Sequence, residues 1–210
     1  MPDSARVLCC DVETADVLAA LALGMLAGAV GCLVQLHRLA PEVSPVRDAV
    51  SNYGAGPHAW WYRAQVVLIG VGASAIWMGL RSAGFDGDGS IWLVIFALAR
   101  VAIAGFPVDL PGAPRTRTGT VHNVLAAAAF ASIAVAAGEL SGWLADRPDW
   151  VFDGPWYRWA GGCVAVIAGA LAVTFVVPAL RRRVFGLVER CWYAAAILWL
   201  TLTAAGLRLR

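Results

Sequence analysis

Residues 17–36, VLAALALGMLAGAVGCLVQL, decide the fold class of this chain. The stretch contains no charged residue. At a helical rise of about 1.5 Å per residue, it is long enough to cross the roughly 30 Å hydrocarbon core of a bilayer. Backbone polar groups find no water in hydrocarbon, so a spanning segment of this kind must be a helix. The sequence therefore predicts a transmembrane helix here, preceded by a short N-terminal tail over residues 1–16.

Five further apolar stretches follow at residues 60–80, 91–106, 121–140, 159–180 and 187–207. They are rich in Ala, Leu and Val and lack the period-two alternation of a membrane β-barrel. The stretch before Pro107 is the shortest, so we expect its helix to run slightly past that proline. The prediction is an all-α, polytopic integral membrane protein, with a bundle of six transmembrane helices in residues 17–207.

The composition agrees with this fold class. The chain is 60% hydrophobic and 14% charged, whereas a soluble domain is nearer half apolar and a quarter charged. The 16 basic residues are all arginine and are spread along the chain, which leaves no basic stripe for nucleic acid. The ten tryptophans suit the two membrane interfaces. The lipid bilayer is thus the expected surrounding, and nucleic acid is not an expected partner.

An even number of crossings places both termini at one end of the bundle, here named the terminal end. The opposite end, named the polar end, holds residues 37–59, 107–120 and 181–186, which we predict as connections. The polar end carries nine arginines and four acidic residues, and the terminal end carries six arginines and ten acidic residues. Positive residues favour the cytoplasmic side, and the Arg181–Arg183 run is the strongest part of that argument. We predict a multi-pass protein of the cell membrane with a cytoplasmic polar end and extracytoplasmic termini.

Unusual polar residues gather at the polar end. They include all three histidines, His37, His58 and His122. Charged and hydrogen-bonding side chains at helix ends usually face the bundle interior or a water-filled cavity. We therefore predict a polar pocket at this end. Its candidate ligand-binding residues are Asp48, Ser51, Tyr53, His58, Arg100, Asp109, Arg115, His122, Glu189 and Arg190.

Three stretches of this region also carry a resemblance. They are SPVRDAVSNYG at 44–54, FPVD with GTVH across 106–122, and GLVER at 186–190. Their order is similar to that of the membrane family called domain of unknown function 998, and the similarity covers nearly the whole chain. It implies a six-helix bacterial or archaeal membrane protein and supplies no catalytic residue. The characteristic polar positions would be Asp48, Ser51, Tyr53, Asp109, His122, Glu189 and Arg190.

Arg100 is a charge inside a predicted span. It lies six residues before Phe106, which is roughly 9 Å below the polar end. A charge at the bilayer centre costs about 2.5–3.5 kcal/mol on insertion scales. Two readings stay open, a snorkelling or structurally paired arginine and an anion-binding group in a cavity. We predict that Arg100 points into the bundle, within salt-bridge reach of an acid at the polar end.

Local motifs for metal or covalent chemistry are absent from the sequence. It contains no HxxxH, HExxH or CxxC pattern, so neither a metal site nor a cofactor is expected. Ser51 lacks a GxSxG elbow, although His and Asp residues are available for a triad. Turn-forming residues between Asp109 and His122 are expected to bring these two side chains together.

Three functions remain open at this point. The first is binding or handling of an anionic amphiphile, a lipid or other anionic small molecule, in the polar pocket. The second is a membrane-embedded enzyme that uses His122 with Asp109 or Asp48 as acid and base. The third is a structural or accessory membrane subunit without a pocket.

Overall fold

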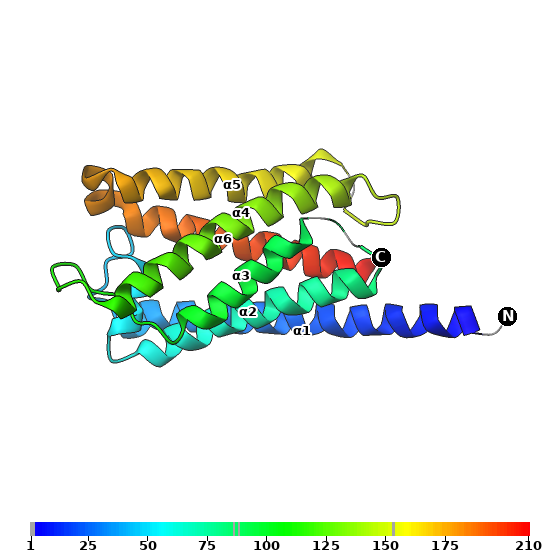
Figure 1. Ribbon diagram of the computed structural model, residues 1–210, viewed down its shortest axis with the longest axis horizontal. Helices are drawn as coiled ribbons and strands as arrows, with labels where there is room; N and C mark the ends of the chain where they lie inside the picture. Colours follow the sequence, from blue (N-terminus) through cyan, green and yellow to red (C-terminus); the bar gives the residue numbers. More distant parts are fainter. Residues whose placement is uncertain (1–2, 86, 88, 153) are drawn as a thin grey trace.

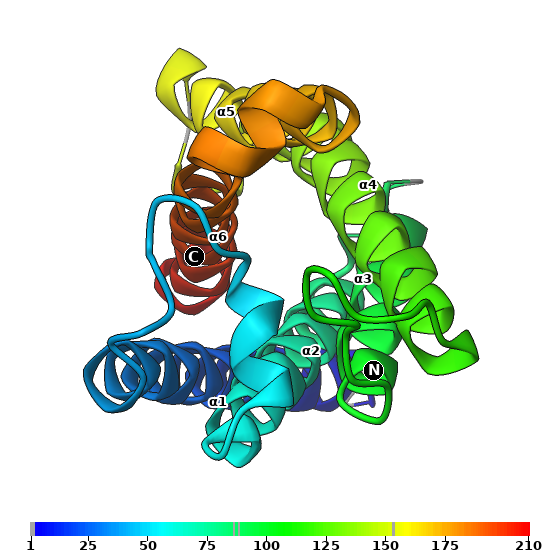
Figure 2. The ribbon, with the colours of Figure 1, turned by 90° about the vertical axis from the view of Figure 1, so that its left-hand side faces the viewer.

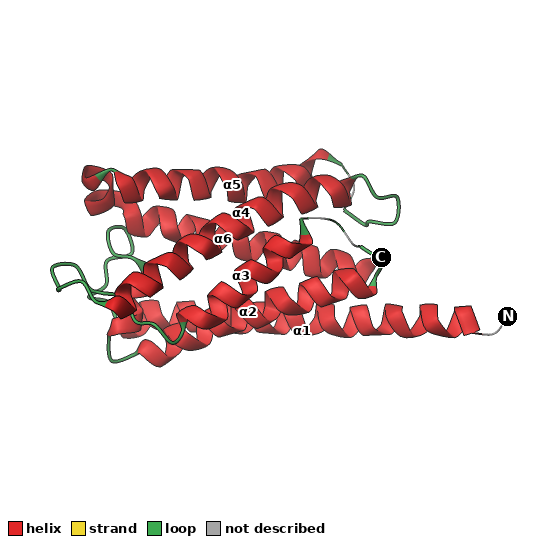
Figure 3. Ribbon diagram, in the orientation of Figure 1, coloured by secondary structure: helices red, strands yellow, loops and turns green. Residues whose placement is uncertain are grey.

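The computed structural model describes residues 3–85, 87, 89–152 and 154–210, with residues 3–12 as backbone. This part of the chain contains helices and loops and no strand (Figure 3). The elements are α1 (Asp3–Leu39), the 3₁₀ helix η1 (Val50–Ala55), α2 (Ala59–Ser82), α3 (Ser90–Ile103), α4 (Arg117–Ala145), α5 (Pro155–Val176) and α6 (Pro178–Leu209).

Five of the described helices, α1, α2, α4, α5 and α6, are long and apolar enough to cross a bilayer. The sixth, α3, has 14 residues, or about 21 Å of helix. Large apolar side chains cover the outside of the bundle. Leu98 is 66% exposed and Val166 is 73% exposed, which would be a liability in water but suits a lipid-facing surface. The chain is a polytopic helical membrane protein.

The helices form a closed ring. Each packs beside its neighbour in sequence, and α6 returns to α1 and also contacts α2 (Figure 2). Both termini lie at the same end of the bundle (Figure 1), as expected when six helices each run between its two ends. The connections at the opposite, polar end surround the site described below.

Helix α4 runs obliquely across the bundle. It lies beside α5 at the terminal end and moves away from α5 towards the polar end (Figures 1 and 2). The close approach is at Gly161, where an added Cβ would lie 2.8 Å from Cβ of Ser141 and closer still to the Ala137 carbonyl oxygen. Small residues allow such backbone proximity between membrane helices. The two helices therefore form a V that opens towards the polar end.

The structure corrects three predicted boundaries. Residues 1 and 2 lie outside the described residues, but the remainder of the expected tail, from Asp3 onward, continues helix α1. Helix α3 ends at Ile103 and does not pass Pro107, since a proline disfavours helical geometry in the residue before it.

The third correction concerns the connection between α5 and α6. The predicted loop at 181–186 is wrong, because α5 ends at Val176 and α6 begins at Pro178. Val177 between them is extended, with φ −87° and ψ 107°. Pro178 cannot donate a backbone hydrogen bond to continue α5, but it suits the first position of a new helix. Arg181–Arg183 thus lie in the opening turns of α6, and they remain at the polar end.

Candidate functional site

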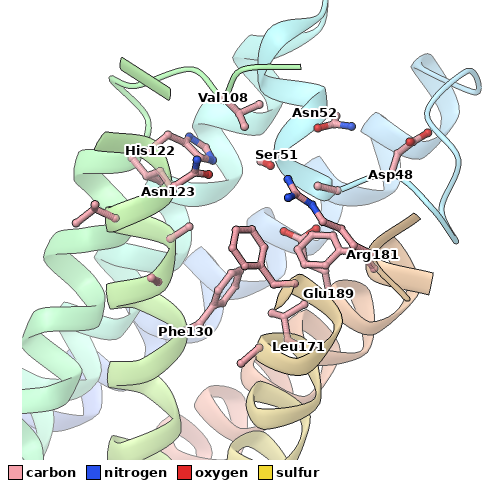
Figure 4. A pocket seen from close by; sticks show the side chains of 18 of the residues that line it. Asp48, Ser51, Asn52, Val108, His122, Asn123, Phe130, Leu171, Arg181 and Glu189 are labelled. Atoms are coloured by element: carbon pink, nitrogen blue, oxygen red, sulfur yellow. The ribbon is translucent and has the colours of Figure 1, made fainter. Parts of the chain in front are cut away.

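A cavity of about 1570 Å³ opens at the polar end. Its walls come from the α1–α2 and α3–α4 connections and from α2, α3, α4, α5 and α6. Figure 4 shows Arg181 and Glu189 of α6 on one side of the cavity, with His122 and Asn123 of α4 on the other. Ligand pockets commonly measure about 300–1,000 Å³, so this one has room for a ligand larger than a drug-sized molecule.

Seven of the predicted site residues line this cavity and three do not. Those that line it are Asp48, Ser51, Arg100, Asp109, Arg115, His122 and Glu189. Those outside the lining are Tyr53, His58 and Arg190. His58 is half-buried at the start of α2 and makes no side-chain cap there.

Arg190 fastens the α1–α2 connection to α6. Its Nη1 donates to the Asp48 carbonyl at 2.8 Å and its Nη2 donates to the Tyr53 hydroxyl at 3.3 Å. Its Nε donates to Nε2 of His37 at 2.9 Å, while His37 Nδ1 donates to the Leu33 carbonyl. Arg190 and Tyr53 therefore build the wall behind the cavity and do not face a ligand.

The same connection packs tightly on α6 and α2. An added Cβ at Gly186 would lie 2.8 Å from the backbone nitrogen of Asp48, and one at Gly54 would lie 2.7 Å from Cδ1 of Tyr62. These glycines leave the space that η1 needs. The result is a fixed position for Ser51 and Asn52, which both line the cavity.

Each acid of the cavity accepts a hydrogen bond from another part of the protein. Glu189 Oε2 accepts from the Val50 backbone N–H at 2.6 Å, and Asp48 Oδ2 accepts from Ser44 N–H at 2.7 Å. Asp109 accepts from Thr116 N–H at 2.9 Å and from its hydroxyl at 2.7 Å. These bonds from Thr116 hold the pKa of Asp109 below its usual value. The acids thus serve to hold the connections in place.

Arg100 points into the bundle, as predicted, and is 2% exposed. Its Nη2 donates to the Tyr193 hydroxyl at 2.9 Å and to Gln65 Oε1 at 3.4 Å. The guanidinium carbon also lies 5.0 Å from the centre of the Tyr193 ring. The predicted salt bridge is wrong, because the ion pairs among the described residues do not include Arg100. The hydrogen-bond partners of Arg100 are neutral side chains. Glu189 instead accepts a hydrogen bond from the Val50 backbone.

Asp109 and His122 both border the cavity, but they bind different partners. His122 is 2% exposed, and its Nδ1 donates to the Phe106 carbonyl at 2.7 Å. No hydrogen bond joins His122 to Asp109 in the described part of the chain. Nδ1 of His122 is therefore held by backbone, while the ring faces the cavity (Figure 4).

Several polar residues of the cavity escaped the sequence prediction. They are Arg47, Asn52, Tyr62, Asn123, Arg181, Arg182 and Tyr193. Arg181 and Arg182 belong to the predicted loop at 181–186 and are not among the predicted ligand-binding residues. Tyr62 and Tyr193 lie inside apolar spans, where no local signal separates a cavity residue from a packed one.

The cavity has more arginines than acids, and the excess is not paired. Five arginines line it against three acids. The arginine–acid ion pairs of the described residues include Arg147–Asp149, Arg158–Asp146 and Arg208–Asp16 at the terminal end, and they include none of the five cavity arginines. Arg181 lies over the Phe175 ring, 4.8 Å from its centre. Cationic groups with no acidic partner thus surround the cavity mouth.

The deeper part of the cavity is apolar and lies in the V between α4 and α5. Facing stripes of small residues line it, with Ala127, Ala131 and Ala134 on α4 and Ala168, Gly169 and Ala172 on α5. Phe130 and Leu171 project into it as well (Figure 4). Below the V, buried pairs such as Trp199 Nε1 with Ser141 Oγ at 2.7 Å fill the bundle. One cavity therefore combines a cationic mouth with an apolar shaft.

Comparison with known protein families identifies the family of this chain. The family model "Protein of unknown function (DUF998)" matches residues 22–206, which is most of the chain. The chain belongs to the DUF998 family. No curated protein and no solved structure matches it.

In this DUF998 protein, the three stretches that carried the resemblance all lie at the cavity. Residues 44–54 and 106–116 form connections around the mouth, and residues 117–122 open α4 beside them. Residues 186–190 face the first connection from α6. The residues that the structure describes hold no group of three or more His, Cys, Asp or Glu side chains placed to bind a metal ion. The polar lining of the cavity consists of arginines, single acids, two tyrosines, His122 and neutral hydroxyl and amide side chains.

Proposed function

We propose that the protein binds and handles an anionic amphiphile, specifically a lipid, in the cavity at the polar end. The observation that carries this proposal is the combination of unpaired arginines at the mouth with an apolar shaft below them. Guanidinium groups pair with phosphate or carboxylate through two parallel hydrogen bonds. An apolar shaft gives the chain of the same molecule an environment as apolar as the bilayer.

The V between α4 and α5 suits the apolar half of such a ligand. Alanine and glycine on both walls leave room that larger side chains would fill. The helices approach closely at Gly161 and diverge towards the polar end. We therefore expect an acyl or prenyl chain to lie along this V with its anionic group towards the mouth.

The orientation of the protein determines which leaflet supplies the ligand. The polar end carries nine of the sixteen arginines, and Arg181–Arg183 stay at this end although they belong to α6. By the positive-inside rule this end is cytoplasmic. We propose that the protein resides in the cell membrane and takes its ligand from the cytoplasmic leaflet.

The two alternative functions have less support. An acid–base enzyme needs His122 paired with a carboxylate, but Asp109 bonds to Thr116 and Asp48 bonds to Ser44. A purely structural subunit would have a fully packed bundle, and a cavity of about 1570 Å³ argues against this.

Native mass spectrometry of the full-length protein in a mild detergent tests the proposal. The test variant carries Arg181→Gln and Arg182→Gln, and the control carries Arg147→Gln and Arg158→Gln at the terminal end. Charge-assisted hydrogen bonds are worth about 1.5–3 kcal/mol, so we expect at least tenfold weaker lipid binding in the test variant alone, measured as lower lipid occupancy below saturation. Wild-type protein without bound lipid, or equal occupancy in all three proteins, would overturn the proposal.

A further inference from the structure

A polar cluster lies at the inner side of the cavity, below the arginines of the mouth. Arg100 from α3, Gln65 from α2 and Tyr193 from α6 meet there, and all three are buried. Tyr62 and Glu189 complete its surroundings. Arg100, Tyr62, Tyr193 and Glu189 line the cavity itself. Four of the five residues therefore border the cavity that a ligand would enter through the mouth.

This cluster contains hydrogen-bond donors and a positive charge that the protein does not satisfy. Nε of Arg100 and Nε2 of Gln65 are buried and have no hydrogen-bond partner among the described residues. Glu189 balances Arg100 only at longer range, since it bonds to the Val50 backbone. A buried charge without a paired counter-ion is costly. A bound anion at Arg100 would supply the missing partner.

The charge of the cavity indicates what kind of anion fits. Five arginines exceed the three acids by two charges, with His122 counted as neutral. A terminal phosphate carries about −1.5 to −2 at neutral pH, whereas a carboxylate or a phosphodiester carries about −1. A headgroup with an ammonium would add a cation to a site whose acids are already bound to the protein.

We infer that Arg100, with Tyr193 and Gln65 beside it, is the binding point for a terminal phosphate, and that the ligand is a lipid phosphomonoester. This inference rests on the proposed function, because the apolar shaft must hold the chain of the same molecule. The phosphate lies below the mouth, where Arg181 and Arg182 first attract it. Zwitterionic phospholipids and fatty acids are then weaker ligands.

Binding of defined lipids to the purified, delipidated full-length protein tests the inference. The probes are dioleoyl phosphatidic acid, dioleoyl phosphatidylcholine, oleate and inorganic phosphate, each titrated in the same detergent. We expect phosphatidic acid to bind at least tenfold more tightly than the other three. Arg100→Gln should remove this preference, and the control Arg158→Gln should keep it. Tyr193→Phe, which keeps the ring and removes only the hydroxyl, should weaken phosphatidic acid binding several-fold.

The outcomes separate the two proposals. Absence of binding by both phospholipids and oleate would overturn the proposed function and this inference together. Equal binding of phosphatidic acid and phosphatidylcholine would overturn the inference alone, as would a preference that survives in both Arg100→Gln and Tyr193→Phe. Inorganic phosphate that binds as tightly as phosphatidic acid would indicate a free-anion site and would also overturn it. If Arg100→Gln does not fold, the Tyr193→Phe titration decides.

Discussion

The V that forms the apolar shaft includes a tight contact between α4 and α5 at Gly161, and that contact can be tested. An added Cβ at Gly161 would lie 2.8 Å from Cβ of Ser141, whereas an ordinary carbon–carbon contact is about 3.5–4.0 Å. In Gly161→Ala, α4 and α5 must therefore part by about 1 Å. Overpacking of this kind costs about 1–3 kcal/mol. It also disturbs the bond from Trp199 Nε1 to Ser141 Oγ, worth about 0.5–1.5 kcal/mol.

The neighbouring glycine is a matched control. An added Cβ at Gly162 meets nothing within 4 Å, and replacing a helical glycine with alanine gains about 0.5–1 kcal/mol. The two losses together are about 1.5–4.5 kcal/mol, and after the same gain is subtracted we expect Gly161→Ala to lose about 0.5–4 kcal/mol. Gly162→Ala should be unchanged or slightly more stable. The sign of the effect thus differs between adjacent positions of one helix.

Thermal unfolding in one detergent, followed by tryptophan fluorescence, measures both variants. A loss of 1 kcal/mol lowers Tm by roughly 2–4 °C in a chain of this size. We expect Gly161→Ala to unfold below the wild type and Gly162→Ala at or above it. If Gly161→Ala unfolds at the wild-type temperature, or if the two variants behave alike, the close approach of α4 and α5 is refuted.

Three further predictions concern topology, Arg100 and the α3–α4 connection. A reporter fused after Arg210 should read as extracytoplasmic, and a cytoplasmic signal would place the polar end outside. Arg100→Leu should lower Tm in detergent more than Arg158→Leu, because it leaves the buried Tyr193 hydroxyl and Gln65 Oε1 without their hydrogen-bond donor, whereas Arg158 is half-exposed. Equal Tm values would mean that these hydrogen bonds add nothing to stability. Since Thr116 lowers the pKa of Asp109, folding favours the ionised carboxyl. That stabilisation is present above about pH 4 and is lost as the pH falls through the lowered folded pKa. Asp109→Asn should flatten this part of the Tm–pH curve, and an unchanged acid slope would contradict the role of Asp109.

Local chemistry made the fold class predictable from the sequence. Length and hydropathy of a segment decide whether it crosses a bilayer, and residues 17–36 contain both signals. The same holds for the even number of crossings and for the gathering of polar residues at one end. The α5–α6 boundary was missed although its signal, Pro178, is also local. The apolar run continues through Leu180, so the predicted span extended past Pro178.

Tertiary packing decided the site, because its contacts join residues far apart in the chain. Arg100 meets Gln65 and Tyr193, which lie 35 and 93 positions away. The sequence of a single span does not indicate these contacts. The sequence therefore predicted an acidic partner for Arg100 instead. The cavity likewise results from the divergence of α4 and α5, which a contact at Gly161 sets and no single helix encodes. Hydropathy is a property of each segment alone, whereas a cavity exists only where segments fail to fill the space between them.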